Sequence, residues 1–158
     1  MNRMQNGFTM VELITVMVIL GIISAIAIPR LLSSGSTFAS ATYRQTVVAA
    51  LRHAQKSAVG HRRLVCANFT TTTVTLTIAA ANPAAACNTT LASPDGSAYA
   101  SSDASVTATD TATGQAPAAL FFLPDGQITD NSGVPATLTI TIANLGNITV
   151  NGNTGYVE

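Results

Sequence analysis

The sequence is poor in the residues that carry most enzyme and metal chemistry. Its 158 residues include no tryptophan, two histidines and two cysteines, and charged residues make up only 9%. His53 and His61 do not have the i, i+4 spacing that places two zinc ligands on one helical face. No phosphate-binding loop, Ser-centred strand–turn–helix motif or pair of acids is apparent, which disfavours an enzyme, although catalytic groups can also assemble from distant positions. We expect no catalytic residue, no metal and no cofactor.

The two cysteines limit the covalent crosslinks that the chain can form. Cys66 and Cys87 allow one intramolecular disulfide, and no third Cys or His stands at a zinc-binding spacing. In an oxidising compartment this bridge would stabilise the fold by about 3 kcal/mol in the loop-entropy model. Two buried free thiols are the alternative. Asp95, Asp103 and Asp110 lack the spacing of a calcium-binding loop.

The net charge of zero conceals a segregation of sign along the chain. Apart from Glu12, every acidic residue lies within residues 95–158, whereas the cationic residues all come earlier. Apolar residues make up 47% of the chain, which suits one modest domain joined to an apolar anchor. Beyond Arg3, the cationic residues are Arg30, Arg44, Arg52, Lys56, Arg62 and Arg63.

Residues 8–28 form an apolar run with one charge, Glu12. At about 1.5 Å per residue, a helix of this length crosses a hydrocarbon core of about 30 Å, so we predict a membrane helix. A secretory signal peptide is the alternative, because Arg3 precedes the run and residues 24–27 could serve as a cleavage site. The run is longer than the usual apolar region of a signal peptide, and a signal would carry no acid there.

Glu12 needs an explanation in such a helix. An ionised side chain inside the bilayer costs about 2.5–3.5 kcal/mol, so Glu12 is expected either to find a partner or to stay solvated near the interface. Gly21 and Pro29 weaken the same helix, through backbone entropy and a lost hydrogen bond respectively, and predict a mild kink.

The rest of the chain predicts an α+β fold, in which one helix is followed by an antiparallel sheet. Residues 36–59 have helical periodicity, and Gly60 is the expected C-terminal stop. Residues 79–117 show little periodicity and are expected to form a functional or loosely ordered connection. The apolar helical positions are Val47, Leu51, Ala54 and Ala58. Strands are expected at residues 64–69, 74–78, 119–123, 137–142 and 147–151.

Residues 7–14, GFTMVELI, closely resemble the processing motif of type IV prepilins. The resemblance implies cleavage between Gly7 and Phe8 by a prepilin peptidase, N-methylation of Phe8, and pairing of Glu12 with the terminal amine of a neighbouring subunit. It also implies loss of helicity between Gly21 and Pro29 in a filament. The implied organisation is a leader at 1–7, a transmembrane and assembly helix at 8–29, an amphipathic continuation at 30–60 and an extracytoplasmic β-rich domain at 61–158.

Later segments are similar to the GspH/FimT branch of this family, namely residues 51–58, residues 121–126 and residues 154–157. This implies a minor pilin or pseudopilin of a type IV pilus or a type II secretion system, with a major pilin as the alternative. The implied location is the bacterial inner membrane, with a cytoplasmic N-terminus and a body in the periplasm or in an extracellular filament. The implied partners are other pilin subunits, the prepilin peptidase, the inner-membrane assembly platform and membrane lipid.

DNA capture is a competing hypothesis, since some FimT-like pilins bind DNA. A basic cluster with no nearby acid could contact phosphates. The C-terminal segment, residues 153–158, has no arginine, and no series of aromatic side chains is available for stacking, both of which disfavour this function. The cluster consists of Arg52, His53, Lys56, His61, Arg62 and Arg63.

Overall fold

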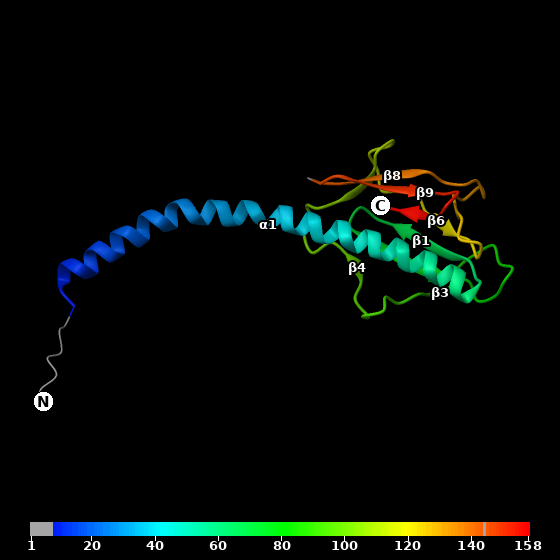
Figure 1. Cartoon of the computed structure of the whole chain (residues 1–158), viewed down its shortest axis with the longest axis horizontal. Helices are drawn as coiled ribbons and strands as arrows, with labels where there is room; N and C mark the ends of the chain where they lie inside the picture. Colours follow the sequence, from blue (N-terminus) through cyan, green and yellow to red (C-terminus); the bar gives the residue numbers. More distant parts are fainter. Residues whose placement is uncertain (1–7, 144) are drawn as a thin grey trace, which may run out of the picture. The chain divides into compact units, whose positions relative to one another are not determined.

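The computed structural model describes residues 8–143 and 145–158, and the chain divides into two compact units with a boundary between Gly35 and Ser36. Helix α1 (Met10–His61) begins in the first unit and ends in the second, which we call the body. In the body, α1 packs against antiparallel β-sheet structure, which confirms the predicted α+β fold (Figure 1).

The strands of the body form two antiparallel sheets rather than the single sheet expected from the sequence. The larger sheet has the order β3-β2-β1-β6-β7, with β4 also paired to β2, and the smaller sheet has the order β10-β9-β8-β5. The strands are β1 (Val65–Phe69), β2 (Thr73–Ile78), β3 (Thr89–Thr90), β4 (Tyr99–Ala100), β5 (Ala108–Asp110), β6 (Leu120–Phe122), β7 (Ile128–Thr129), β8 (Leu138–Ile142), β9 (Asn147–Asn151) and β10 (Tyr156–Val157).

One apolar core joins α1 to both sheets. The four apolar helical positions predicted from periodicity are all fully buried, so the helical face was correctly identified. Strands β8 and β9 alternate buried residues with more exposed ones, and in β8 Leu138, Ile140 and Ile142 point inward. The other large side chains of this core include Tyr43, Leu76, Leu120, Phe122, Ile128, Ile148 and Val150.

Helix α1 ends with a Schellman turn, and the expectation that Gly60 stops it is wrong. The Arg63 N–H donates to the carbonyl oxygen of Ala58 at 3.1 Å, and the Arg62 N–H donates to that of Val59 at 3.3 Å. In this motif the residue after the helix takes the left-handed conformation, and that residue is Arg62, with φ of 53°. Gly60 lies inside the helix and does not supply the positive φ.

The segment 79–117, expected to be loose or functional, contains the short strands β3, β4 and β5. Strand β3 pairs with the end of β2, whereas β4 pairs with its beginning. Strand β5 leaves this region altogether and pairs with β8 of the smaller sheet. The connection therefore belongs to both sheets, which its composition did not indicate.

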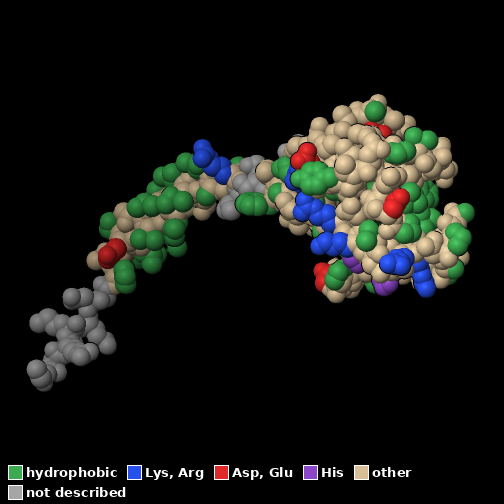
Figure 2. All heavy atoms as spheres, turned by 45° about the vertical axis from the view of Figure 1, so that its right-hand side comes forward, with side chains coloured by type: hydrophobic (Ala, Val, Ile, Leu, Met, Phe, Trp, Pro, Cys, Tyr) green, Lys and Arg blue, Asp and Glu red, His purple; other side chains and the backbone are tan. Residues whose placement is uncertain are grey.

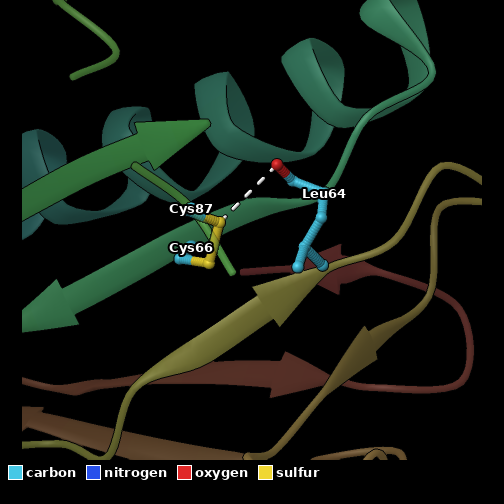
Figure 3. Close-up of a disulfide and its surroundings, with 3 residues drawn as sticks. All are labelled: Leu64, Cys66 and Cys87. Atoms are coloured by element: carbon cyan, nitrogen blue, oxygen red, sulfur yellow. Dashed lines mark hydrogen bonds between the residues drawn. A yellow bond between two sulfur atoms is a disulfide. The ribbon is translucent and has the colours of Figure 1, made fainter. Parts of the chain in front are cut away.

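Cys66 and Cys87 form a disulfide on the side of the larger sheet that faces away from the main core (Figure 3). Leu64, Cys66 and Ala79 make a small buried cluster there, and Phe121 packs partly against it. The Sγ atom of Cys87 lies 3.6 Å from the carbonyl oxygen of Leu64; this is a close contact, because a disulfide sulfur has no proton to donate. The bridge holds the segment before β3 against β1.

Candidate assembly site

The first unit presents an apolar surface on every side of α1. Within residues 8–30, the large apolar side chains are all exposed, from 49% for Val16 to 84% for Phe8. The helix is long and apolar enough to cross a membrane, with mean hydropathy 2.6 over an 18-residue window of which 0% is buried. Figure 2 shows hydrophobic side chains covering the visible face of this segment. A helix that is apolar all round is stable only in lipid or among other apolar helices, so this surface requires a partner.

Glu12 lies in the first turn of this apolar helix. The Thr9 hydroxyl caps the helix by accepting a hydrogen bond from the Glu12 N–H at 3.2 Å. The Thr15 hydroxyl donates to the Glu12 carbonyl oxygen at 2.9 Å. A carboxylate in the first turn also interacts favourably with the positive end of the helix dipole. Among the described residues, no cationic side chain pairs with the Glu12 carboxylate.

The N-terminal sequence matches a known family model. This model, described as a prokaryotic N-terminal methylation motif, matches residues 2–28. The chain carries a prepilin-type N-terminus. This motif, together with the apolar helix, supports a type IV pilin-like or pseudopilin-type structural subunit that is anchored in a membrane. The motif implies processing by a prepilin peptidase and assembly with other pilin subunits. No curated protein and no solved structure matches the chain.

The residues predicted for processing lie at the start of the described residues or outside them. Gly7 and the leader 1–7 fall outside the described residues, and Phe8 is the first residue described. Gly21 and Pro29 both lie inside α1, which is helical across the predicted weak stretch. A Cβ added at Gly21 would meet no atom within 4 Å. Cleavage, methylation and local loss of helicity in a filament therefore remain predictions.

The structure splits the predicted basic cluster into two places. Arg52, His53 and Lys56 line a groove of about 360 Å³ on the body, whereas Arg62 and Arg63 form the turn after α1. Figure 2 shows Lys, Arg and His side chains gathered over one part of the body surface. We call the groove that contains Arg52, His53 and Lys56 the basic groove. It is lined by Gln45, Val48, Ala49, Arg52, His53, Lys56 and Pro94.

Two of the arginines tie α1 to the smaller sheet. The Arg52 Nη2 atom donates to the carbonyl oxygen of Val157 at 3.0 Å, and the Arg44 Nη2 atom donates to that of Asn147 at 3.2 Å. Arg52 uses one of its five N–H donors in this bond and keeps the others available. Arg52 therefore helps to hold the body together as well as lining the groove.

His53 is oriented by a tyrosine that sequence reasoning missed. The Tyr99 hydroxyl and His53 Nδ1 are 2.9 Å apart, and partial burial lowers the pKa of His53. Burial raises the pKa of Tyr99, and the nearby Asp95 carboxylate adds to this effect. Tyr99 lies in β4, a strand too short to show any periodicity, so the sequence held no signal for this contact.

The described residues contain no group of three or more His, Cys, Asp or Glu side chains that could hold a metal ion. His53 is committed to Tyr99, and His61 lies at the last residue of α1. Both cysteines belong to the disulfide.

Proposed function

We propose that this protein is a minor pilin or pseudopilin of the GspH/FimT type, which is cleaved between Gly7 and Phe8, N-methylated at Phe8 and assembled into a type IV pilus or a type II secretion pseudopilus. The observation that carries the proposal is an exposed apolar helix with a single acid, Glu12, which lies within a prepilin-type motif. The role is structural and needs no catalytic group.

The chemistry of association follows from the cost of burying Glu12. When the apolar helices of several subunits pack together, the carboxylate leaves water and an unpaired charge becomes costly. Cleavage after Gly7 creates a terminal amine at Phe8. This amine carries one positive charge, which can balance the single negative charge of the Glu12 carboxylate. Pairing this amine with Glu12 of an adjacent subunit neutralises both charges and fixes the axial register between the two helices.

The remaining partners and the location follow from the same role. We place the N-terminus in the cytoplasm, the helix in the inner membrane, and the body in the periplasm or in an extracellular filament. The assembly platform of the inner membrane would extract the subunit from lipid. The geometry does not favour DNA capture, since Arg62 and Arg63 do not line the groove that contains Arg52 and Lys56.

Glu12→Ala tests the proposal in cells that carry the assembly machinery. We expect normal processing but loss of the protein from sheared filaments, because the Phe8 amine then lacks its counter-ion. Thr15→Ala is a matched control one turn along the same helix, since it removes a hydroxyl that only bonds the local backbone, and it should be incorporated normally. Normal incorporation of Glu12→Ala would contradict the role given to Glu12.

Mass spectrometry of the wild-type membrane protein tests the processing step. The expected mature terminus is N-methylated Phe8. An intact leader, or a cut near Ala27 that releases the body, would overturn the assignment as a pilin.

A further inference from the structure

One face of α1 in the body is left uncovered by the two sheets. Its first large residue is Phe38, which is apolar and 72% exposed, and which follows the apolar part of the same helix. Burying a side chain of this kind stabilises an association by about 1.5–3 kcal/mol. Exposed residues then recur every three or four positions, so they lie on one face of the helix. We call this face the α1 stripe; after Phe38 it consists of Ala41, Gln45, Ala49, Arg52 and Lys56.

The far end of the α1 stripe lies in the basic groove and keeps unused hydrogen-bond donors. Lys56 forms no hydrogen bond or ion pair with any residue that the structure describes. Arg52 gives one N–H to the Val157 carbonyl oxygen. Asp95 lies beside the groove, but its Oδ1 accepts from the Ser93 hydroxyl at 2.6 Å and the Ser97 N–H at 3.0 Å. The stripe therefore begins with an exposed apolar residue and ends with available positive charge.

The number of charges at this end indicates what kind of anion fits. The cations are Arg52 and Lys56, because burial lowers the pKa of His53 and leaves its imidazole neutral at pH 7. Asp95 on the adjoining loop offsets part of their charge. A nucleic-acid backbone is held by several cationic contacts, which this groove does not supply. One carboxylate of a protein can instead accept hydrogen bonds from both cations.

The axial register of assembly indicates which protein brings that carboxylate. Pairing of the Phe8 amine with Glu12 shifts adjacent helices by four positions, or roughly 6 Å at about 1.5 Å per residue. The body part of α1, residues 36–61, is about 39 Å long by the same measure. Parallel helices in this register therefore overlap along most of their body parts. The neighbours of a subunit present in few copies are pilins of other kinds.

We propose that the α1 stripe is the contact surface for a different pilin subunit, which buries Phe38 and places an Asp or Glu side chain in the basic groove against Lys56 and Arg52. The apolar end of the stripe supplies binding energy, and the charged end selects an acidic neighbour and fixes its orientation. The proposal deepens the proposed function and rests on it, since it names the partner of the body in the filament.

Lys56 is the only lysine in the chain, which makes a direct test available. A zero-length carbodiimide reagent joins a lysine amine to a carboxylate only where they are in contact. In filaments that contain the full-length protein, we expect a peptide with Lys56 to be joined to an Asp or Glu of a different protein whose own N-terminus is N-methylated. Lys56→Arg keeps the charge but removes the reactive amine, so it should lose this crosslink.

Charge exchange tests the charged end of the stripe. Lys56→Glu should lower incorporation into sheared filaments about tenfold, because two like charges then face each other. Arg62→Glu is the matched control: it makes the same change of charge in the turn after α1, outside the groove, and should be incorporated normally. Replacing the crosslinked acid of the partner with Lys should restore incorporation of Lys56→Glu.

Phe38→Ala tests the apolar end. It should also lower incorporation, whereas the Tm of the body should not change, because Phe38 is exposed in the free subunit. Val134→Ala removes an exposed apolar side chain elsewhere on the body and should be incorporated normally.

Three results would overturn the proposal. They are Lys56 joined to a second copy of this chain or to a protein without an N-methylated terminus, no crosslink in filaments that contain the protein, and normal incorporation of Lys56→Glu. If the wild-type protein keeps its leader and is absent from filaments, the proposed function fails instead.

Discussion

Arg62 carries the backbone conformation that ends helix α1. A non-glycine residue with φ of 53° costs about 1 kcal/mol or more, because its Cβ crowds the following carbonyl. We predict that Arg62→Gly raises the free energy of unfolding of the body by about 0.5–1 kcal/mol, which is a rise of several degrees in Tm. Thermal unfolding followed by circular dichroism measures this change.

Two variants separate the conformational effect from the loss of the arginine side chain. Arg62→Ala removes the same charge but keeps a Cβ, so it should not stabilise. Gly60→Ala should stabilise by about 0.5–1 kcal/mol, since Gly60 lies within the helix and an added Cβ meets nothing within 4 Å. A destabilised Gly60→Ala variant would mean that Gly60 is the helix cap after all.

His53 should make the body less stable in mild acid. Its pKa is lowered from the ordinary value of 6.5 by partial burial, so the unfolded chain binds the proton more readily than the folded chain. Stability is therefore full above about pH 6.5 and is lost as pH falls through the lowered pKa. Arg52 and Lys56 on α1 and Asp95 on the facing loop are the charged groups nearest the pair.

Urea unfolding between pH 7.5 and 5 measures this loss, and His53→Gln should flatten the profile. Tyr99→Phe should lower stability across the whole range, because it removes the hydrogen-bond partner of His53 without removing the titrating group. An unchanged pH profile in His53→Gln would rule out His53 as the source.

At the scale of elements, the disulfide holds a long connection against the larger sheet. We predict that Cys66→Ala with Cys87→Ala lowers the free energy of unfolding by roughly 2–4 kcal/mol, because a 21-residue loop is released in the unfolded chain. Replacing both cysteines leaves no reactive thiol. Proteolysis under native conditions should then cut first between β2 and β4, whereas equal resistance to protease with and without the bridge would show that this connection does not need it.

The longer elements were predictable from the sequence because their periodicity extends over several turns or alternations. Residues Val47 to Ala58 repeat at helical spacing. Strands β1, β6, β8 and β9 fall within the expected ranges, and β2 begins one residue before its expected range. Strands of two or three residues, such as β4 and β5, cannot show an alternation, and long-range pairing alone defines them. The same limit applies to the groove: its rim residues were identified by charge, but only tertiary packing brings Pro94 to α1 and Tyr99 to His53.

At the scale of the whole molecule, the body has a core of its own. Among the residues whose side chains the structure describes, none before Ser40 is buried. The main core runs from Tyr43 to Val157. The apolar part of α1 contributes nothing to this core. We therefore predict that a fragment of residues 36–158 unfolds cooperatively, with a Tm within a few degrees of the full-length protein in detergent.

A shorter fragment, residues 51–158, is the matched contrast. It lacks Tyr43, Val47 and Val48, whose buried side chains contribute about 1.5–3 kcal/mol each, a total comparable with the whole stability of about 5–15 kcal/mol of a typical domain. It should therefore show no cooperative transition and no near-ultraviolet signal from ordered tyrosines. If this fragment folds, or if the 36–158 fragment does not, the division of the helix into an assembly half and a core half is wrong. A folded 36–158 fragment would show that the body does not need the apolar helix in order to fold.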